Sequence, residues 1–478
     1  MKMFYKIVLA SFFLSNILQA NMINDKITLK PSMQIAYNQV PSSVDSIDQI
    51  FSEGMLYGRL RSNIFLWEWD DPSKLDTKAM GIGGSLIYKT APYKGWNTTI
   101  GVYTTQNPAW FREDAQDVSS IKAGKDTLSR YRVTSSGKYG MSVLGQAYLQ
   151  YNSPYFLMKL GRQMFESLFT KSNDTKMIPN TFDGITFTSK KVSKAKIRLA
   201  YFAKQKLRDH TTSHDIISFA GGSSPDKWLE NDDAGVNKNL TVARIGDSNE
   251  LIIFDMKNRF SKDLKYTLNY ALIPSVLSNF TFEGHYAIPL DMKWKIIPGF
   301  RFMQQFDHLG ADYGVANLKG DQSSYKNPNS LDTNLLAFRV DLKRGAFLGR
   351  LGYSKIADKA DIVTPWRGFP TGGFTRAMAQ YNWYANTKTY MLRAGYDFDK
   401  AGLVDGFSIM GRYAIQDFDE SKPGVQADSN VIHVDMMQNF TNNLQGKIRI
   451  GLIDADPKNS GKADVSYDEY RFELNYFF

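Results

Sequence analysis

The chain comprises 478 residues, carries a formal net charge of +10 and contains no cysteine. The absence of cysteine excludes disulfides, thiol catalysis and metal or iron–sulfur sites built on cysteine. Mean hydropathy is −0.35, and no run of about 18 apolar residues follows residue 20, which excludes a helical membrane protein. The basic residues are scattered rather than clustered in a tail or helix, which argues against nucleic acid as a partner.

The first 20 residues have the pattern of a secretory signal peptide. Lys2 and Lys6 flank the start of an apolar run from Ile7 to Leu14, and Ala20 stands at a suitable cleavage point. We therefore expect residues 1–20 to direct export. Residues 21–54 show no sustained alternation, and we expect an irregular N-terminal segment there.

From Met55 to the end, apolar and polar residues alternate in short segments, which predicts an all-β fold. Each segment is near the length that a tilted strand needs to cross a bilayer. The expected strands are 55–69, 78–90, 96–105, 141–151, 155–163, 184–190, 195–204, 250–259, 264–273, 278–288, 291–306, 331–343, 346–356, 387–398, 407–417, 430–440, 444–454 and 467–478.

The connections between these strands alternate in length. Short turns such as PYKG, NSP, KRG and TNN alternate with a second set that includes 106–140, 164–183, 205–249, 307–330, 357–386 and 418–429. A soluble sandwich has no reason to sort its loops in this way, whereas an outer-membrane barrel has short periplasmic turns and long extracellular loops. Residues 376–384 also alternate, but a strand there would break the pattern, so we assign them to a loop. Residues 55–478 are thus predicted to form an 18-stranded antiparallel transmembrane β-barrel.

A closed barrel in lipid needs one apolar face and one water-facing side on every strand. The last strand shows this pattern clearly, with Tyr470, Phe472 and Leu474 on one face and Arg471 and Glu473 on the other. Extending the alternation predicts a pore lined by basic residues, namely Arg59, Arg61, Arg301, Arg339, Arg350, Arg393, Arg412, Lys447 and Arg449. Fewer acidic residues share this face: Asp255, Glu283, Asp341, Asp397, Asp435 and Glu473. The surplus of cations would attract anions, although some arginines would instead pair with these carboxylates and hold the wall together.

One polar stretch interrupts the alternation between Lys159 and Gly184. It carries Asn173, Asp174, Lys176 and Asn180. In a soluble protein such a stretch would be a surface loop. In a closed barrel a loop of this length can fold into the lumen and narrow it.

Other polar constellations do not support an enzyme, a metal site or a cofactor. His210 and His214 stand four residues apart but lack the glutamate of a zinc protease, so only incidental metal binding remains open. The Gly81-x-Gly83-Gly84 run lies within a predicted strand, where no helix follows to hold a phosphate. The acidic loop residues Asp454, Asp456, Asn459 and Asp464 do not have EF-hand spacing, and a solvated loop explains them better.

Several of these stretches, in order, resemble the OprD-type porins, the outer-membrane carboxylate channels. VLGQAYLQYNSPYFLMKLGRQ and SNDTKMIPNTFDGI are similar to their fourth and fifth strands and third loop, and YDEYRFELNYFF to their closing strand. The resemblance implies that loops 164–183 and 357–386 fold inward and form a constriction. It also implies a basic ladder opposite these loops, at Arg59, Arg61, Arg301, Arg350, Arg393, Arg412 and Arg449. Lys176 departs from the arginine that the family usually has there, and 106–140 and 205–249 are long insertions.

Together these features predict an outer-membrane porin that mediates passive diffusion of small water-soluble solutes, with a preference for those carrying a carboxylate. Its partners would be outer-membrane lipid and small anionic solutes, and it would be a monomer or a loose trimer. A general porin with little solute preference and a surface adhesion protein remain as alternatives. No cofactor is implied.

Overall fold

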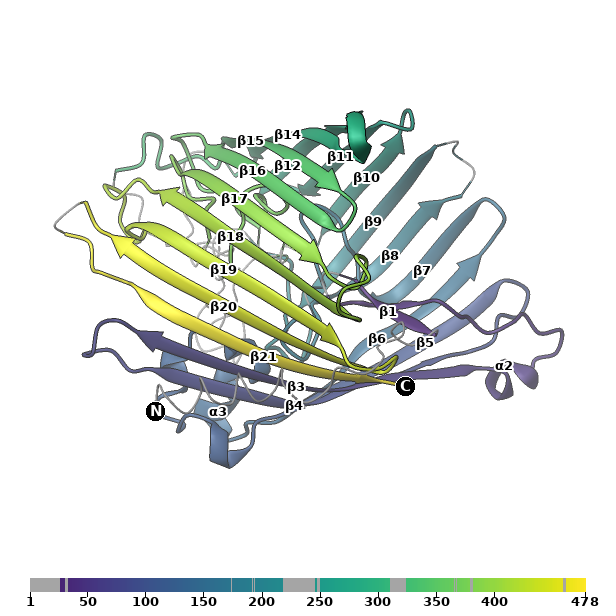
Figure 1. Cartoon of the computed structure of the whole chain (residues 1–478). Coiled ribbons are helices and arrows are strands. Elements are labelled where there is room, and N and C mark those ends of the chain that lie inside the picture. The colour runs from purple at the N-terminus through teal and green to yellow at the C-terminus, as the bar shows by residue number, and fades with distance from the viewer. Residues whose placement is uncertain are drawn as a thin grey trace.

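The computed structural model describes residues 26–30, 33–172, 174–190, 192, 194–217, 246, 250–309, 324–364, 366, 368–378, 381–458 and 461–478. The expected signal peptide, residues 1–20, lies outside the described residues. The described chain forms one closed barrel of antiparallel strands (Figure 1). Among the described residues, none of the helices has the length and apolarity of a membrane-crossing helix.

Eighteen strands of this barrel match the eighteen that the alternation predicts. Their bounds are β3 Met55–Trp69, β4 Thr77–Lys89, β5 Trp96–Gln106, β6 Met141–Asn152, β7 Phe156–Gln163, β8 Thr181–Ser189, β9 Ala195–Lys206, β10 Leu251–Arg259, β11 Leu264–Ile273, β12 Leu277–Tyr286, β14 Lys295–Asp307, β15 Thr333–Arg344, β16 Phe347–Ile356, β17 Lys388–Asp397, β18 Phe407–Asp417, β19 Asp428–Asn439, β20 Leu444–Asp456 and β21 Tyr467–Phe477. A two-residue strand, β13 (Ile288–Pro289), additionally pairs with β14. Residues 376–378 and 381–384 lie outside the strands, as we expected.

The expected strand 291–306 begins four residues later than predicted. Asp291–Lys293 forms a short 3₁₀ turn, η5, in which Met292 and Lys293 have φ angles of 56° and 65°. A β-strand requires negative φ, so the left-handed conformation of these two residues prevents the strand from starting before Lys295.

The barrel closes where β21 pairs with β3. The register runs from Tyr467 opposite Trp69 to Phe477 opposite Arg59, and the Gly58 amide donates to the Phe478 carbonyl at 3.0 Å. Because the sheet has no free edge, backbone amides and carbonyls within the membrane are paired with neighbouring strands.

The outer face of the barrel is apolar. Leu60, Leu160, Leu351 and Leu392 are each more than half exposed, whereas Arg61 and Arg301, on the opposite face, are only 3 and 4% exposed. Outward aromatic rings also contact one another near the short turns, for example Trp96–Tyr151, Tyr151–Phe156, Trp294–Phe347 and Phe398–Phe407. An apolar band bordered by aromatic rings is the surface that a bilayer requires.

The two ends of the barrel differ, as the loop lengths predict. One end, which we name the short-turn end, carries tight turns such as 345–346 and both barrel termini. The other, the long-loop end, carries 107–140, 164–180, 308–332 and 357–387, together with the shorter connections 70–76 and 274–276. The connection 107–140 contains three 3₁₀ turns and one helix: η1 Ala109–Phe111, η2 Val118–Ser120, η3 Lys125–Thr127 and α3 Arg130–Ser136.

The N-terminal segment is more ordered than we expected. Residues 21–54 were predicted to be irregular, but β1 (Ile27–Leu29) and β2 (Ile35–Tyr37) form an antiparallel hairpin inside the barrel, and α2 (Gln49–Ser52) lies at its short-turn end (Figure 1). Ile27 and Ile35 pack in one cluster with Tyr57 and Ile87 of the wall and with Met177. Three-residue strands are too short to show alternation, so the sequence did not reveal this hairpin.

Candidate functional site

The connection 164–180 folds into the lumen and is held there by Asp174. Its carboxylate pairs with Arg59 and Arg61 of β3; Arg61 Nη1 lies 2.9 Å from Oδ1 and also donates to the Asp174 carbonyl at 3.1 Å. The Asp174 side chain is 1% exposed. Removing charges from water is unfavourable unless they are paired, so this buried ion pair fixes the loop to the wall. Asn173, which we also predicted for this loop, lies outside the described residues.

Glycines of β4 make room for the loop. A Cβ atom on Gly81 would lie 2.7 Å from Cγ of Met177, which is far inside van der Waals contact. Gly83 stands directly opposite Arg61 in the β3–β4 register. A Cβ atom on Gly83 would lie 2.2 Å from the Thr104 carbonyl oxygen, so this glycine allows β4 and β5 to approach closely. The Gly81-x-Gly83 pattern, which we rejected as a phosphate loop, therefore leaves space for the inward loop and for the neighbouring strand. It was the one sequence signal for this packing.

The two other predicted loop residues have different surroundings. Lys176 is 6% exposed, and its ammonium lies 4.0 Å from the centre of the Phe65 ring. Burial lowers the pKa of Lys176 well below its usual value. Asn180 is fully buried, and its backbone N–H donates to the Ser172 carbonyl at 2.8 Å, which closes the base of the loop.

The connection 357–387 also folds inward, and the predicted lumen arginines hold its backbone. Their guanidinium groups donate to loop carbonyls: Arg301 to Pro370, Arg339 and Arg350 both to Gly373 at 2.6 Å, and Arg412 to Arg376 at 2.7 Å. Hydrogen bonds from charged donors are stronger than neutral ones. These arginines therefore position the loop as well as lining the lumen.

The two inward loops contact each other. The Lys171 amide donates to the Trp366 carbonyl at 3.0 Å, and the rings of Phe169 and Trp366 are 6.3 Å apart. A Cβ atom on Gly368 would lie 2.1 Å from the Phe169 carbonyl oxygen, so only glycine allows this approach. The loops thus form one assembly across the lumen.

Six of the nine predicted pore-lining basic residues form ion pairs. Arg59 and Arg61 pair with Asp174, Arg61 also with Glu473, Arg301 with Glu283, Arg339 and Arg350 with Asp341, and Arg449 with Asp435. Most of these side chains therefore stabilise the wall and the loops. The other three, Arg393, Arg412 and Lys447, form no ion pair with a carboxylate of the described chain.

Arg350, Arg393 and Arg412 stand directly opposite one another on three neighbouring strands. The register pairs Arg350 with Arg393 and Arg393 with Arg412. Side chains opposite one another in an antiparallel sheet have Cβ atoms about 5 Å apart, and like charges there are destabilising. Arg393 has no hydrogen-bond acceptor among the described residues, and its Nε atom is buried without a partner.

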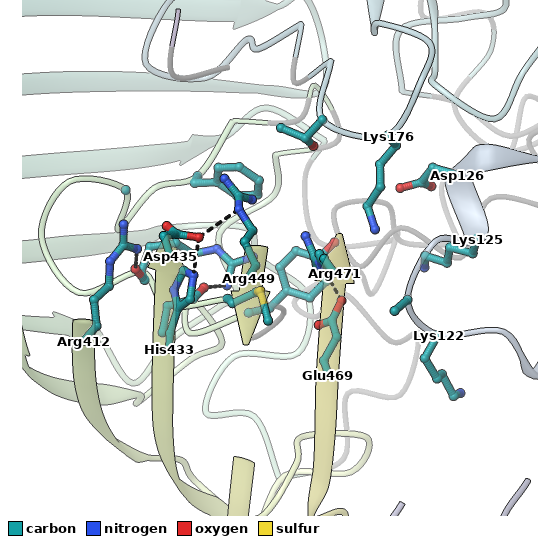
Figure 2. Close-up of a pocket in the computed structure, with 18 of the residues that line it drawn as sticks. Lys122, Lys125, Asp126, Lys176, Arg412, His433, Asp435, Arg449, Glu469 and Arg471 are labelled. Carbon is teal, nitrogen blue, oxygen red and sulfur yellow. Dashed lines mark hydrogen bonds and ion pairs between the residues drawn. The ribbon is translucent and has the colours of Figure 1, made fainter. Parts of the chain in front are cut away.

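A cavity of about 540 Å³ lies between this part of the wall and the inward loops. Figure 2 shows Arg412, His433, Asp435 and Arg449 side by side on the wall, with Lys176 pointing in from its loop. Eight basic side chains line the cavity: Lys122, Lys125, Lys176, Arg208, Arg376, Arg412, Arg449 and Arg471. Its three acidic side chains, Asp126, Asp435 and Glu469, each pair with one of these bases, and basic side chains outnumber acidic ones among the described lining residues.

Aromatic rings surround one of these cations. The Arg376 guanidinium lies 4.8 Å from the Phe369 ring and 5.6 Å from the rings of Tyr381 and Trp383. Burial lowers the pKa of Arg376 to about 10, so the group stays charged at neutral pH. The cavity therefore presents charge beside apolar surface.

A much smaller space adjoins this cavity. A second cavity of about 10 Å³ shares Thr175, Arg449 and Arg471 with the first and continues to Lys447 and Glu473, nearer the short-turn end. That volume holds about one water molecule. Thr175 of the inward loop and Lys447 and Glu473 of the wall therefore line one small space.

The described residues offer little to a metal ion. No group of three or more His, Asp or Glu side chains in the described chain is placed to hold one. The rings of His210 and His214 are 4.8 Å apart, edge to face, and His210 Nε2 lies 3.9 Å from Asp209.

A closed barrel with an apolar exterior and a charged lumen narrowed by loops is a membrane channel. Residues 155–477 match the outer membrane porin family OprD, and the chain belongs to this family. It is accordingly a passive channel of the bacterial outer membrane and not an enzyme. The short-turn end of such barrels faces the periplasm.

Solved structures share the fold over most of the chain. OccAB1 of Acinetobacter baumannii is 12% identical and covers 91% of this chain and 99% of its own, with a TM-score of 0.69. OccK8 (OprE) of Pseudomonas aeruginosa is 14% identical, with coverage of 90 and 99% and a TM-score of 0.68. OpdK of the same organism, solved with vanillate, is 12% identical, with the same coverage and a TM-score of 0.66. The comparison with curated protein sequences gives no match.

Proposed function

We propose that the channel conducts small water-soluble solutes that carry a carboxylate. The observation that carries this proposal is the row formed by Arg350, Arg393 and Arg412, in which Arg393 has no acceptor within the described part of the chain. A row of like charges weakens the sheet, so it needs a compensating partner. An anion in the lumen provides one, and a guanidinium matches the two oxygens of a carboxylate.

In this proposal the nine basic residues divide into two groups. Arg393, Arg412 and Lys447 contact the solute, since they form no ion pair in the described chain. Arg59, Arg61, Arg301, Arg339, Arg350 and Arg449 mainly fix the wall and the two loops. Several weak contacts in sequence allow throughput better than one strong site, because the solute must also leave.

The constriction loop sets the size limit. Asp174 fixes its position, Asn180 closes its base, and Lys176 provides the polar edge that we propose faces the solute. OpdK, which shares the fold, was solved with vanillate, an aromatic carboxylate. A cavity that combines arginines with Phe369, Tyr381 and Trp383 suits a solute of this kind. The proposal also includes export directed by residues 1–20, and a monomer or loose trimer.

Liposome swelling tests the proposal. Proteoliposomes containing the full chain are placed in iso-osmotic solutions of carboxylates, amines and uncharged sugars of matched size. We expect the carboxylates to enter fastest, because the cavity has excess positive charge. Equal rates for all three classes would favour a general porin, and no swelling at all would favour the surface adhesion protein.

A further inference from the structure

A third cavity, of about 260 Å³, lies at the short-turn side of the inward loop, between the N-terminal hairpin and the wall. Three lysines line it: Lys30 from the hairpin, Lys89 at the end of β4 and Lys159 in β7. None of its lining residues is acidic. This cavity is separate from the 540 Å³ cavity, because the two share no lining residue. Met164 of the connection 164–180 lines the smaller cavity, whereas Thr175 and Lys176 of that connection line the larger one.

The three ammonium groups have only neutral partners in the described chain. Lys30 donates to the Gln34 side chain at 3.1 Å, and Lys159 donates to the Tyr148 hydroxyl at 3.4 Å. Lys89 has no hydrogen-bond acceptor and lies 5.3 Å from the centre of the Tyr37 ring. Glu166, the acid whose charge acts on Lys30, pairs with Lys171 at 3.6 Å and does not line the cavity.

The cavity also offers neutral polar groups. The Tyr37 hydroxyl is buried and has no partner in the described chain. Gln146 and Gln150 of β6 are 4 and 8% exposed and present side-chain amides to the same space. Lysine binds a compact oxyanion as a point charge, without the planar match that arginine gives to one carboxylate. Lys89 is 7% exposed and Lys159 is half-buried, whereas Lys30 is exposed at the edge of the cavity. A buried charge without a counter-charge is unfavourable, and one negative charge would compensate only one of the lysines.

We propose that this cavity binds a small oxyanion that carries two negative charges, such as a dicarboxylate or inorganic phosphate. The cavity would be a binding site on the periplasmic side of the constriction. This proposal rests on the proposed function, because solutes reach the cavity through the pore. Lys30 and Lys89 precede residue 155, where the match to the porin family begins, so the family match does not assign this site. The hairpin that supplies Lys30 is the segment whose structure the sequence did not predict.

The test uses the full chain in planar lipid bilayers. Succinate, inorganic phosphate or acetate is added to each side in turn, and brief blockades of single-channel current are counted against concentration. We expect the two dianions to block the unmodified channel, and acetate to block far more weakly. In Lys89→Gln/Lys159→Gln the apparent affinity should fall about tenfold or more, because two charged contacts are lost.

Two controls separate this site from general effects. Lys343→Gln removes a lumen-facing charge near the short-turn end of β15, away from the cavity, and should leave the blockade unchanged. Lys30→Gln alters an exposed hairpin residue and leaves the barrel wall intact, so it should weaken the blockade even if the double variant folds poorly. Blockade by phosphate but not succinate would assign the site to phosphate.

The site is ruled out if neither dianion blocks the unmodified channel from either side, or if Lys343→Gln weakens the blockade as much as Lys89→Gln/Lys159→Gln. The reversal potential in a salt gradient, measured on the same channels, reports the proposed function separately. Retained anion selectivity together with absent blockade would overturn this site alone, whereas lost selectivity in the unmodified channel would overturn the proposed function.

Discussion

Replacing Asp174 with alanine should release the constriction loop and raise single-channel conductance. The substitution leaves Arg59 and Arg61 buried without their shared carboxylate. Breaking a buried ion pair by removing one partner costs about 3–5 kcal/mol, which changes the ratio of docked to undocked loop by about a hundredfold or more. The loop should therefore leave the lumen, and conductance in planar bilayers should rise and become noisier.

A matched control is Asp114→Ala, which removes an exposed carboxylate from the connection 107–140. This variant should conduct like the unmodified channel. Proteolysis gives an independent readout, because a released loop 164–180 should be cleaved faster in Asp174→Ala than in the control. If Asp174→Ala folds into the barrel and keeps its original conductance, the ion pair does not hold the loop.

Neutralising Arg393 and Arg412 should lower anion selectivity. At about 8 Å and an effective dielectric constant of about 20, one charge changes the energy of an anion by about 2 kcal/mol, or about thirtyfold in occupancy. Removing two such charges with Arg393→Gln/Arg412→Gln should therefore reduce the anion-to-cation permeability ratio several-fold. The measurement is the reversal potential in a salt gradient.

The comparison variant is Arg344→Gln/Lys400→Gln, which removes two positive charges at the short-turn end, where both side chains are exposed. Its reversal potential should stay near that of the unmodified channel. An unchanged reversal potential in Arg393→Gln/Arg412→Gln would show that these two arginines do not contact permeating anions. Anion selectivity would then have to come from cations of the inward loops, such as Lys176 and Arg376.

The barrel itself could be predicted closely because lipid and water impose opposite demands on successive residues. Leu60 and Arg61 were assigned to the correct faces from alternation alone. The error at 291–294 has a local cause, since the left-handed conformation of Met292 and Lys293 leaves no mark in an alternating pattern. The hairpin 27–37 was missed because its strands are three residues long.

The partners of the lumen arginines could not be predicted. Alternation shows that Arg59 faces the lumen, but its partner Asp174 lies 115 residues away in the sequence. Asp174 belongs to a loop, and the conformation of a loop cannot be deduced from the periodicity of the sequence. The hydrogen bonds from Arg339 and Arg350 to the Gly373 carbonyl could not be predicted either, because every residue has a backbone carbonyl and the sequence does not indicate which one accepts. Arg301, Arg350 and Arg449, in contrast, pair with acids that stand directly opposite them on a neighbouring strand, where the register gives the contact.

These contacts change how the basic face of the barrel is understood. A guanidinium that holds a loop carbonyl and a carboxylate has few donors left for a solute. In our proposal the charge that acts on solutes is therefore that of Arg393, Arg412 and Lys447, which form no ion pair in the described chain. Selectivity and loop position should then respond to different substitutions.

The most direct test of a lumen with excess positive charge is the reversal potential of the unmodified channel in a gradient of potassium chloride. We expect this potential to lie on the side of the chloride equilibrium potential, because cations lining the cavity favour anions. A potential at zero, or on the potassium side, would contradict an anion-conducting pore.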